Sequence, residues 1–288
     1  MSSSDTLTLV EQAVDHRFAR NGATRIHVAT AGIGRLVLFI HGFPDHWLTW
    51  HAVMAPFLRT HRVAAMDLRG FNLSDQPLNP GDYDLASLVG DVAAAIEACG
   101  AKSAVLVGHD WGGWLAWQVA MTRPDLVEGL VVMDMPHPWA IARELATNPR
   151  QEAASAYVRG FQQPGAERAV PQERLGAWIT DPAYRVRHDA AFARTDLGAP
   201  MNYYRVHFPA PPYQVWESTP PPVKAPTLLI HGLADAYALP EGLNGVWDWV
   251  EAPLTLHAWP GVGHFVQQEQ PGRVVSALAG FLLVHGLS

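Results

Sequence analysis

The chain has 288 residues, of which 49% are hydrophobic and 16% charged, a composition that fits a globular chain with a large core and excludes a disordered one. The formal net charge of −7, without a basic run, argues against a nucleic-acid or anionic-membrane partner. The single cysteine, Cys99, excludes an intrachain disulfide and fits a reducing compartment. The first residues lack a signal-peptide pattern, and no apolar run approaches the ~20 residues that cross a bilayer. We therefore expect a soluble, cytoplasmic protein.

Short apolar runs alternate with helical patterns along the chain, which is typical of parallel strands joined by helices. Five such runs are expected to be strands, at residues 35–40, 62–66, 103–107, 130–133 and 227–230. Each is followed by a cluster of Gly, Pro, His or Asp, and ligands bind beyond the carboxyl ends of parallel strands. The predicted fold class is α/β, with a mostly parallel central sheet flanked by helices.

The alternation stops between about Pro138 and Pro220, where helical patterns occur without a clear strand. A proline-rich stretch closes this region, and the strand pattern resumes at Thr227. We expect a core domain of residues 1–137 and 221–288, with an inserted α-helical cap of residues 138–220 that is returned by a stiff connector. A separate helical domain is the alternative, and the resumed strand pattern favours insertion.

The segment GHDWGG (108–113) follows an expected strand, precedes an expected helix and has the form of a nucleophile elbow, in which small residues flank a nucleophile on a strained turn. Asp110 stands at the nucleophile position. A carboxylate that attacks an sp³ carbon leaves an ester, which water can cleave, whereas a serine would leave an ether. Asp110 is ionised at neutral pH and needs no base. A histidine is therefore expected to act in a second step, on water.

His264 is the expected base, because it lies late in the chain, in a glycine-flanked loop before the last expected helix. Two carboxylates compete to orient it. Asp235 follows the strand at 227–230, and Asp134 follows the strand at 130–133. Asp235 is favoured, and a supporting role for Asp134 stays open.

Backbone N–H groups of Phe43 and Trp111 are expected to form an oxyanion hole for the ester oxygen when water attacks. Phe43 lies in the segment HGFP (41–44), and its bond to Pro44 is a candidate cis peptide. His109, beside the nucleophile, is expected to be a packing or turn residue.

Five segments together resemble the soluble epoxide hydrolases of the α/β-hydrolase family, namely HGFPD (41–45), DLRGFNLSD (67–75), GHDWGG (108–113), DMPHP (134–138) and GVGHFVQQEQP (261–271). The similarity extends from about Leu36 to Val275. It implies conversion of epoxides to vicinal diols without a cofactor or metal. Two positions depart from the family pattern: it more often has Asn where Asp134 stands, and a smaller residue where Trp114 stands.

The resemblance also implies two catalytic tyrosines in the cap. NPRQEAASAYVRGFQQPGAE (148–167) places one at Tyr157, and MNYYR (201–205) places the other at Tyr204. A phenol with a pKa of ~10 is a suitable proton donor for the alkoxide that ring opening produces. The neighbouring Tyr203 is expected to pack on the core.

Two other classes of protein compete with an epoxide hydrolase. A haloalkane dehalogenase would share the Asp110 nucleophile, and the Trp111 indole could bind a departing halide, but no second halide donor is identified. Fluoroacetate-type dehalogenases carry arginines where this chain has Trp111 and Trp114. The third class is a catalytically dead ligand-binding fold, against which the retained His264, Asp235 and tyrosine pair argue.

The expected substrates are a small apolar epoxide and water. No spacing of Cys or His resembles a zinc site, and no cofactor, nucleic acid or membrane partner is expected. A homodimer is the default for a soluble enzyme. The choice of epoxide, of the attacked carbon and of enantiomer depends on pocket shape.

Overall fold

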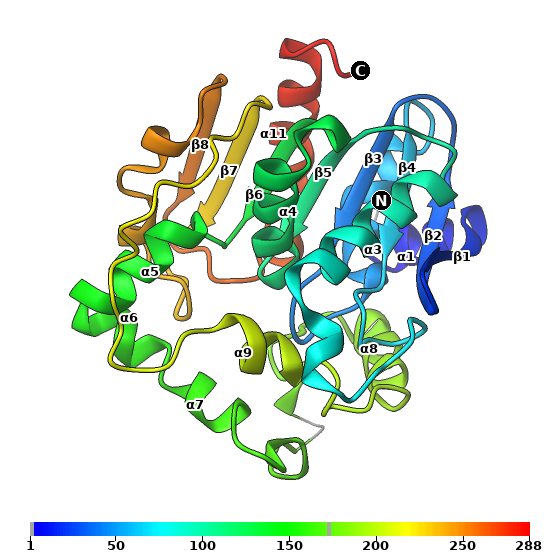
Figure 1. Ribbon diagram of the computed structural model, residues 1–288. Coiled ribbons are helices and arrows are strands. Elements are labelled where there is room, and N and C mark those ends of the chain that lie inside the picture. Colours follow the sequence, from blue (N-terminus) through cyan, green and yellow to red (C-terminus); the bar gives the residue numbers. More distant parts are fainter. Residues whose placement is uncertain (1–2, 172–173) are drawn as a thin grey trace.

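The computed structural model describes residues 3–171 and 174–288, and its centre is an eight-stranded sheet (Figure 1). The strands are β1 (Asp15–Asn21), β2 (Thr24–Ala31), β3 (Leu36–Ile40), β4 (Arg62–Met66), β5 (Ala104–His109), β6 (Val127–Met133), β7 (Thr227–Gly232) and β8 (Leu254–Trp259). Their order across the sheet is β1-β2-β4-β3-β5-β6-β7-β8. The pairs β1–β2 and β2–β4 are antiparallel, and all the other pairs are parallel. The predicted α/β fold class with a mostly parallel sheet is confirmed.

Helices cover both faces of this sheet (Figure 1). They are α1 (Ser3–Ala13), α2 (His51–Met54), α3 (Leu85–Ala98), α4 (Trp111–Thr122), α10 (Val266–Glu269) and α11 (Pro271–Val284). Side chains of α3 and α4 pack in one apolar layer, and those of α1, α2 and α11 pack in the layer on the opposite face. The central strands thus have no face open to water, which explains why they are continuous apolar runs in the sequence.

The period of two residues along each central strand divides its side chains between the two layers. In β3, Leu38 and Ile40 join the α3–α4 layer, whereas Val37 and Phe39 join the layer beneath α1 and α11. None of these four side chains is more than 1% exposed. Burial of one such side chain stabilises the fold by roughly 1.5–3 kcal/mol. The packing holds the carboxyl ends of β3 and β5 in fixed register, with Ile40 beside Gly108.

The segment between β6 and β7 is helical and lies across the carboxyl ends of the parallel strands (Figure 1). It contains α5 (Pro138–Thr147), α6 (Pro149–Ala154), α7 (Tyr157–Phe161), α8 (Pro182–Phe192) and α9 (Met201–His207). The described residues of 138–220 form no strand. We call residues 138–220 the helical segment; their assignment as a cap domain stays a prediction. Among the described residues, no helix combines the length and the apolar character that crossing a bilayer requires.

Candidate active site

Asp110 occupies the turn between β5 and α4 with φ 51° and ψ −123°, a backbone conformation that residues other than glycine rarely adopt. The tight turn explains the flanking glycines. A Cβ atom at Gly108 would lie 2.3 Å from the carbonyl oxygen of Gly112, and one at Gly112 would lie 2.1 Å from that of Ile40. Only glycine fits at these two positions. The turn presents the Asp110 side chain beyond the end of the sheet.

The Asp110 carboxylate is bound from two sides. The backbone N–H of Phe43 donates a hydrogen bond of 2.7 Å to Oδ1, and Nε2 of His264 lies 3.5 Å from Oδ2. The Phe43–Pro44 peptide is cis, as the sequence suggested. A Cβ atom at Gly42 would lie 2.3 Å from Asp110 Oδ1, so a glycine there allows the Phe43 backbone to approach the carboxylate. A donor role for the Trp111 N–H, at the start of α4, stays a prediction.

His264 is oriented by Asp235. Its Nδ1 atom lies 2.7 Å from Asp235 Oδ2. The other oxygen, Oδ1, accepts hydrogen bonds from the backbone N–H groups of Tyr237 at 2.7 Å and Ala238 at 3.1 Å. Asp235 follows β7, and His264 lies between β8 and α10, so two adjacent strands bring them together. The favoured carboxylate of the sequence analysis is therefore the one that contacts the imidazole.

Asp134, the competing carboxylate, is engaged with the backbone. Its two oxygens accept hydrogen bonds from the N–H groups of Gly232, at 2.8 Å, and Val266, at 3.3 Å. Asp134, His231 and Asp235 lie close enough together to suggest a metal site among the described residues. Their polar atoms are already used, however, since His231 Nε2 also lies 2.9 Å from the carbonyl oxygen of Ala238. These bonds assign the cluster to the support of the loop after β7.

Asp110 and His264 are buried groups of opposite charge, and each shifts the pKa of the other. Burial acts to raise the pKa of Asp110, but the hydrogen bond and the positive charge of His264 outweigh burial and hold that pKa below its usual value. Burial likewise acts to lower the pKa of His264, and Asp235 and Asp110 together raise it well above its usual value. Both shifts favour the charged forms of Asp110 and His264, whose Oδ2 and Nε2 atoms lie 3.5 Å apart. Burial raises the pKa of Asp134 well above its usual range.

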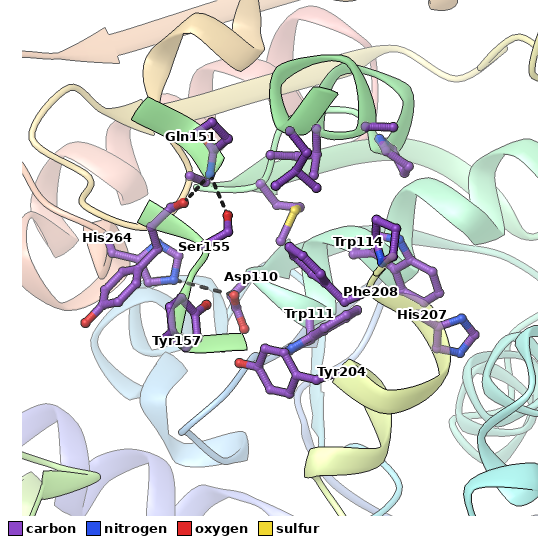
Figure 2. Close-up of a pocket in the computed structure, with 18 of the residues that line it drawn as sticks. Asp110, Trp111, Trp114, Gln151, Ser155, Tyr157, Tyr204, His207, Phe208 and His264 are labelled. Carbon is purple, nitrogen blue, oxygen red and sulfur yellow. Dashed lines mark hydrogen bonds and ion pairs between the residues drawn. The ribbon is translucent and has the colours of Figure 1, made fainter. Parts of the chain in front are cut away.

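Tyr157 and Tyr204 approach Asp110 from the helical segment, at the start of α7 and within α9 (Figure 2). Their ring centroids lie 6.3 Å apart, and the hydroxyl group of Tyr204 points into the space beside Asp110 (Figure 2). Burial, followed by other nearby charges, raises the pKa of both phenols, so they remain protonated donors. Tyr203, in contrast, packs against Tyr83 and is 0% exposed, in agreement with its expected core role.

Two cavities meet at the site, and both are lined by Asp110, Tyr157, Tyr204, Tyr237 and His264. The narrow cavity, of about 70 Å³, is shown in Figure 2. Its further apolar lining includes Trp114, Met135, Ile141, Leu145, Phe208 and Trp216. The wide cavity, of about 340 Å³, is further lined by Phe43, Phe161, Val170, Leu175, Trp178 and Phe265. Both linings suit apolar substituents.

The structure shows what His109 and Trp114, two residues near the nucleophile, contact. The side chain of His109 contacts the loop of the base, since its Nε2 lies 2.7 Å from the carbonyl oxygen of His264. Trp114 lines the narrow cavity and packs against His207, with ring centroids 4.5 Å apart and the ring planes inclined by 42°. Its unusual size thus contributes to the wall of the substrate space.

Sequence reasoning missed Gln151 and Tyr237. The Tyr237 ring packs against those of His264 and Tyr157, at centroid distances of 5.0 and 5.6 Å. Gln151 is 1% exposed and lines the narrow cavity from α6. The available signals were the place of Tyr237 two residues after Asp235 and that of Gln151 within the segment matched to the family.

Known proteins resemble this chain in sequence and in fold. The α/β hydrolase fold family matches residues 35–271 of the chain. The chain is 32% identical to "Epoxide hydrolase 3" of Xenopus tropicalis, over 92% of this chain and 78% of the relative. It is 29% identical to "Epoxide hydrolase 4" of Homo sapiens, over 91% of this chain and 77% of the relative.

Solved structures of epoxide hydrolases have the same fold as this chain. The Bacillus megaterium epoxide hydrolase in complex with an inhibitor is similar with a TM-score of 0.84 and 28% identity, over 92% of this chain and 99% of that one. An epoxide hydrolase from metagenomes of hot environments is similar with a TM-score of 0.84 and 31% identity, over 93% and 98% of the two chains. This chain belongs to the α/β-hydrolase fold family and, within it, to the epoxide hydrolases.

Proposed function

We propose that this enzyme converts an apolar epoxide to a vicinal diol through a covalent ester on Asp110. The observation that carries the proposal is the placement of Asp110 between the Phe43 N–H, His264 and the tyrosine pair. Asp110 Oδ2 attacks one ring carbon, while Tyr157 and Tyr204 bind the epoxide oxygen and protonate the alkoxide. Attack and protonation at the two ends of one C–O bond require this opposed arrangement.

Formation of the ester removes the charge of Asp110, and this change prepares His264 to act as a base in ester hydrolysis. Alkylation makes Asp110 neutral, which removes part of the field that raises the pKa of His264. The proton balance then closes. The tyrosine that protonates the alkoxide is reprotonated at the expense of the imidazolium of His264, which leaves His264 neutral. His264 next takes a proton from water, and the resulting hydroxide attacks the ester carbonyl. The acyl C–O bond then breaks, the departing diol oxygen takes the proton of the new carboxylic acid, and Asp110 is a carboxylate again beside a protonated His264. Oδ1 of Asp110 already faces the Phe43 N–H, so the negative charge develops where a donor is in place.

The substrate is proposed to be an epoxide with apolar substituents, because the linings of both cavities are dominated by aromatic and aliphatic side chains. A cytoplasmic location is proposed on the single, buried and unpaired Cys99.

The test uses His264→Ala, which lacks the base for the second step. The variant is incubated with a panel of aryl and alkyl epoxides and with a matched panel of alkyl halides, and its intact mass is measured. We expect an adduct with the whole mass of the epoxide, because ring opening releases no leaving group. The double variant Asp110→Ala/His264→Ala is the control and should gain no mass.

The other outcomes reject the proposal in different ways. Adducts from halides alone, each lighter than the halide by one hydrogen halide, would make the protein a dehalogenase. A folded variant that gains no mass from either panel, beside a wild type that turns over neither, would make it a binding protein.

A further inference from the structure

Gln151 is a buried glutamine whose side-chain amide is fully used. On α6, its Nε2 donates to Ser155 Oγ at 3.0 Å and to the carbonyl oxygen of Tyr237 at 2.7 Å. Its Oε1 accepts from the backbone N–H of Leu239 at 2.8 Å. The two bonds to Tyr237 and Leu239 cross from the helical segment to the loop that follows β7. The amide therefore joins two parts of the chain that are 86 and 88 positions apart.

The loop that Gln151 binds is the loop that Asp235 binds. Asp235 accepts hydrogen bonds from the N–H groups of Tyr237 and Ala238, and its other oxygen contacts His264. Residues 237–239 are thus held by the triad acid on one side and by Gln151 on the other. A shift of this loop would move the carboxylate that orients the imidazole.

The third hydrogen bond of Gln151, to Ser155, connects it to the segment that contains Tyr157. Ser155, which is 4% exposed, accepts a hydrogen bond from the Gln151 amide and precedes Tyr157 by two residues. The carbonyl oxygen of Ser155 accepts the backbone N–H of Val158 at 3.0 Å, which fixes the first turn of α7. Figure 2 shows Gln151 bonded to Ser155 above the group formed by Tyr157, Asp110 and His264.

We propose that Gln151 is a positioning residue that holds Tyr157 at a fixed position relative to the Asp235–His264 pair. The inference rests on the proposed function. It states that one side chain, that of Gln151, affects the rates of both ring opening and ester hydrolysis. Ring opening depends on the position of Tyr157, and ester hydrolysis depends on that of His264. A misplacement of about 1 Å in such a constellation can reduce a rate about 10²-fold.

The first experiment measures both steps in Gln151→Met, which keeps the length of the side chain and removes its hydrogen bonds. Single-turnover mixing with an aryl epoxide gives the rate of ester formation and the rate of ester decay. We expect both rates to fall by about tenfold or more. Gln163→Met is the matched control, because the Gln163 side chain is exposed and its hydrogen bond among the described residues is a local one, to the carbonyl oxygen of Arg159. Rates within twofold of the wild type, or a fall in one step alone, would overturn the inference.

The second experiment separates positioning from a loss of packing. In Gln151→Glu, the neutral acid can still donate to the Tyr237 carbonyl and accept from the Leu239 N–H, whereas the carboxylate cannot donate. Burial favours the neutral acid, and acidification completes its protonation. The rates of Gln151→Glu relative to wild type should therefore rise as the pH falls, and those of Gln151→Met should not. A ratio for Gln151→Glu that does not change with pH would contradict the inference.

A third readout does not depend on turnover. The pKa of His264, followed by NMR of its ring protons, should be lower in Gln151→Met than in wild type, because Asp235 loses its fixed position. Gln163→Met should leave the pKa unchanged. If wild type forms no ester, the proposed function fails, while this shift still tests the positioning of the pair. An unchanged pKa in Gln151→Met overturns the inference even in an active enzyme.

Discussion

Asp134 Oδ1 accepts a 2.8 Å hydrogen bond from the backbone N–H of Gly232, so a carboxylate at the end of β6 holds the end of β7 in place. Asp134 adopts φ 49° and is 0% exposed. Its hydrogen bonds come from backbone N–H groups and its neighbouring imidazole is that of His231, 3.8 Å away, whereas Asp235 contacts the imidazole of His264 directly. The two carboxylates that the sequence could not separate thus have different neighbours.

Asp134→Asn should therefore keep most of the activity, because the amide oxygen can still accept the Gly232 N–H and the bond that is lost is the longer one, of 3.3 Å, from the Val266 N–H. Asp235→Asn should lower the rate of ester hydrolysis by about 10²–10⁴-fold, since an amide no longer selects the productive imidazole tautomer. Single-turnover decay of the ester measures both variants under the same conditions. The opposite order of effects would transfer the role of triad acid to Asp134.

The tyrosine pair should affect the first step alone. Tyr157→Phe and Tyr204→Phe should each slow ester formation about 10²-fold, and the double variant should nearly abolish diol formation. Tyr203→Phe is the matched control, because the Tyr203 hydroxyl is buried without a hydrogen-bond partner among the described residues. Stopped-flow measurement of ester formation provides the rates. Full activity of the double variant would remove the tyrosines from the mechanism.

The stability of the fold should depend on pH through His264. Its pKa in the folded state is raised above the usual value, so the stabilisation is fully present below pH ~6.5 and is lost as the pH rises through the folded pKa. Within that window, the free energy of unfolding of wild type, relative to His264→Gln, should fall by up to about 1.4 kcal/mol per pH unit. Urea denaturation at a series of pH values measures this difference. A constant difference above pH 6.5 would show that the ion pair does not form.

The elbow should tolerate no side chain at Gly112. Gly112→Ala places a Cβ atom 2.1 Å from the carbonyl oxygen of Ile40 and should cost about 3 kcal/mol or more, if the variant folds at all. Gly160→Ala, within α7, meets no atom within 4 Å and should stabilise by roughly 0.5–1 kcal/mol. Thermal or urea unfolding compares the two. Equal effects would mean that the turn can relax around an added methyl group.

The sequence predicted the buried half of the sheet well. The expected strands at 62–66 and 35–40 differ from β4 and β3 by at most one residue, because strands buried on both faces are continuous apolar runs. Three strands were missed, namely the edge strands β1 and β8 and the strand β2 beside β1. In β1 only Ala19 is buried, and β8 has only Trp259 fully buried, so neither has an uninterrupted apolar signal.

Residues of the site could be predicted from the sequence only where one short motif contains the reacting side chain. Asp110 and His264 stand in glycine-flanked motifs whose backbone geometry restricts the residue type. The choice between Asp134 and Asp235 required the structure, because both carboxylates follow adjacent strands. Gln151 was not predictable, because its hydrogen-bond partners at Tyr237 and Leu239 are brought to it by the packing of the helical segment.

The unequal sizes of the two cavities that Asp110 lines have a stereochemical consequence. An epoxide whose ring carbons carry a long and a short substituent can lie in two orientations, with the long group in the wide or in the narrow cavity. Each orientation presents a different carbon to the carboxylate, and backside attack inverts the configuration at that carbon. The handedness of the diol would then be decided by the shape of the walls at Trp114 and Trp178, while the reacting groups remain the same for both products.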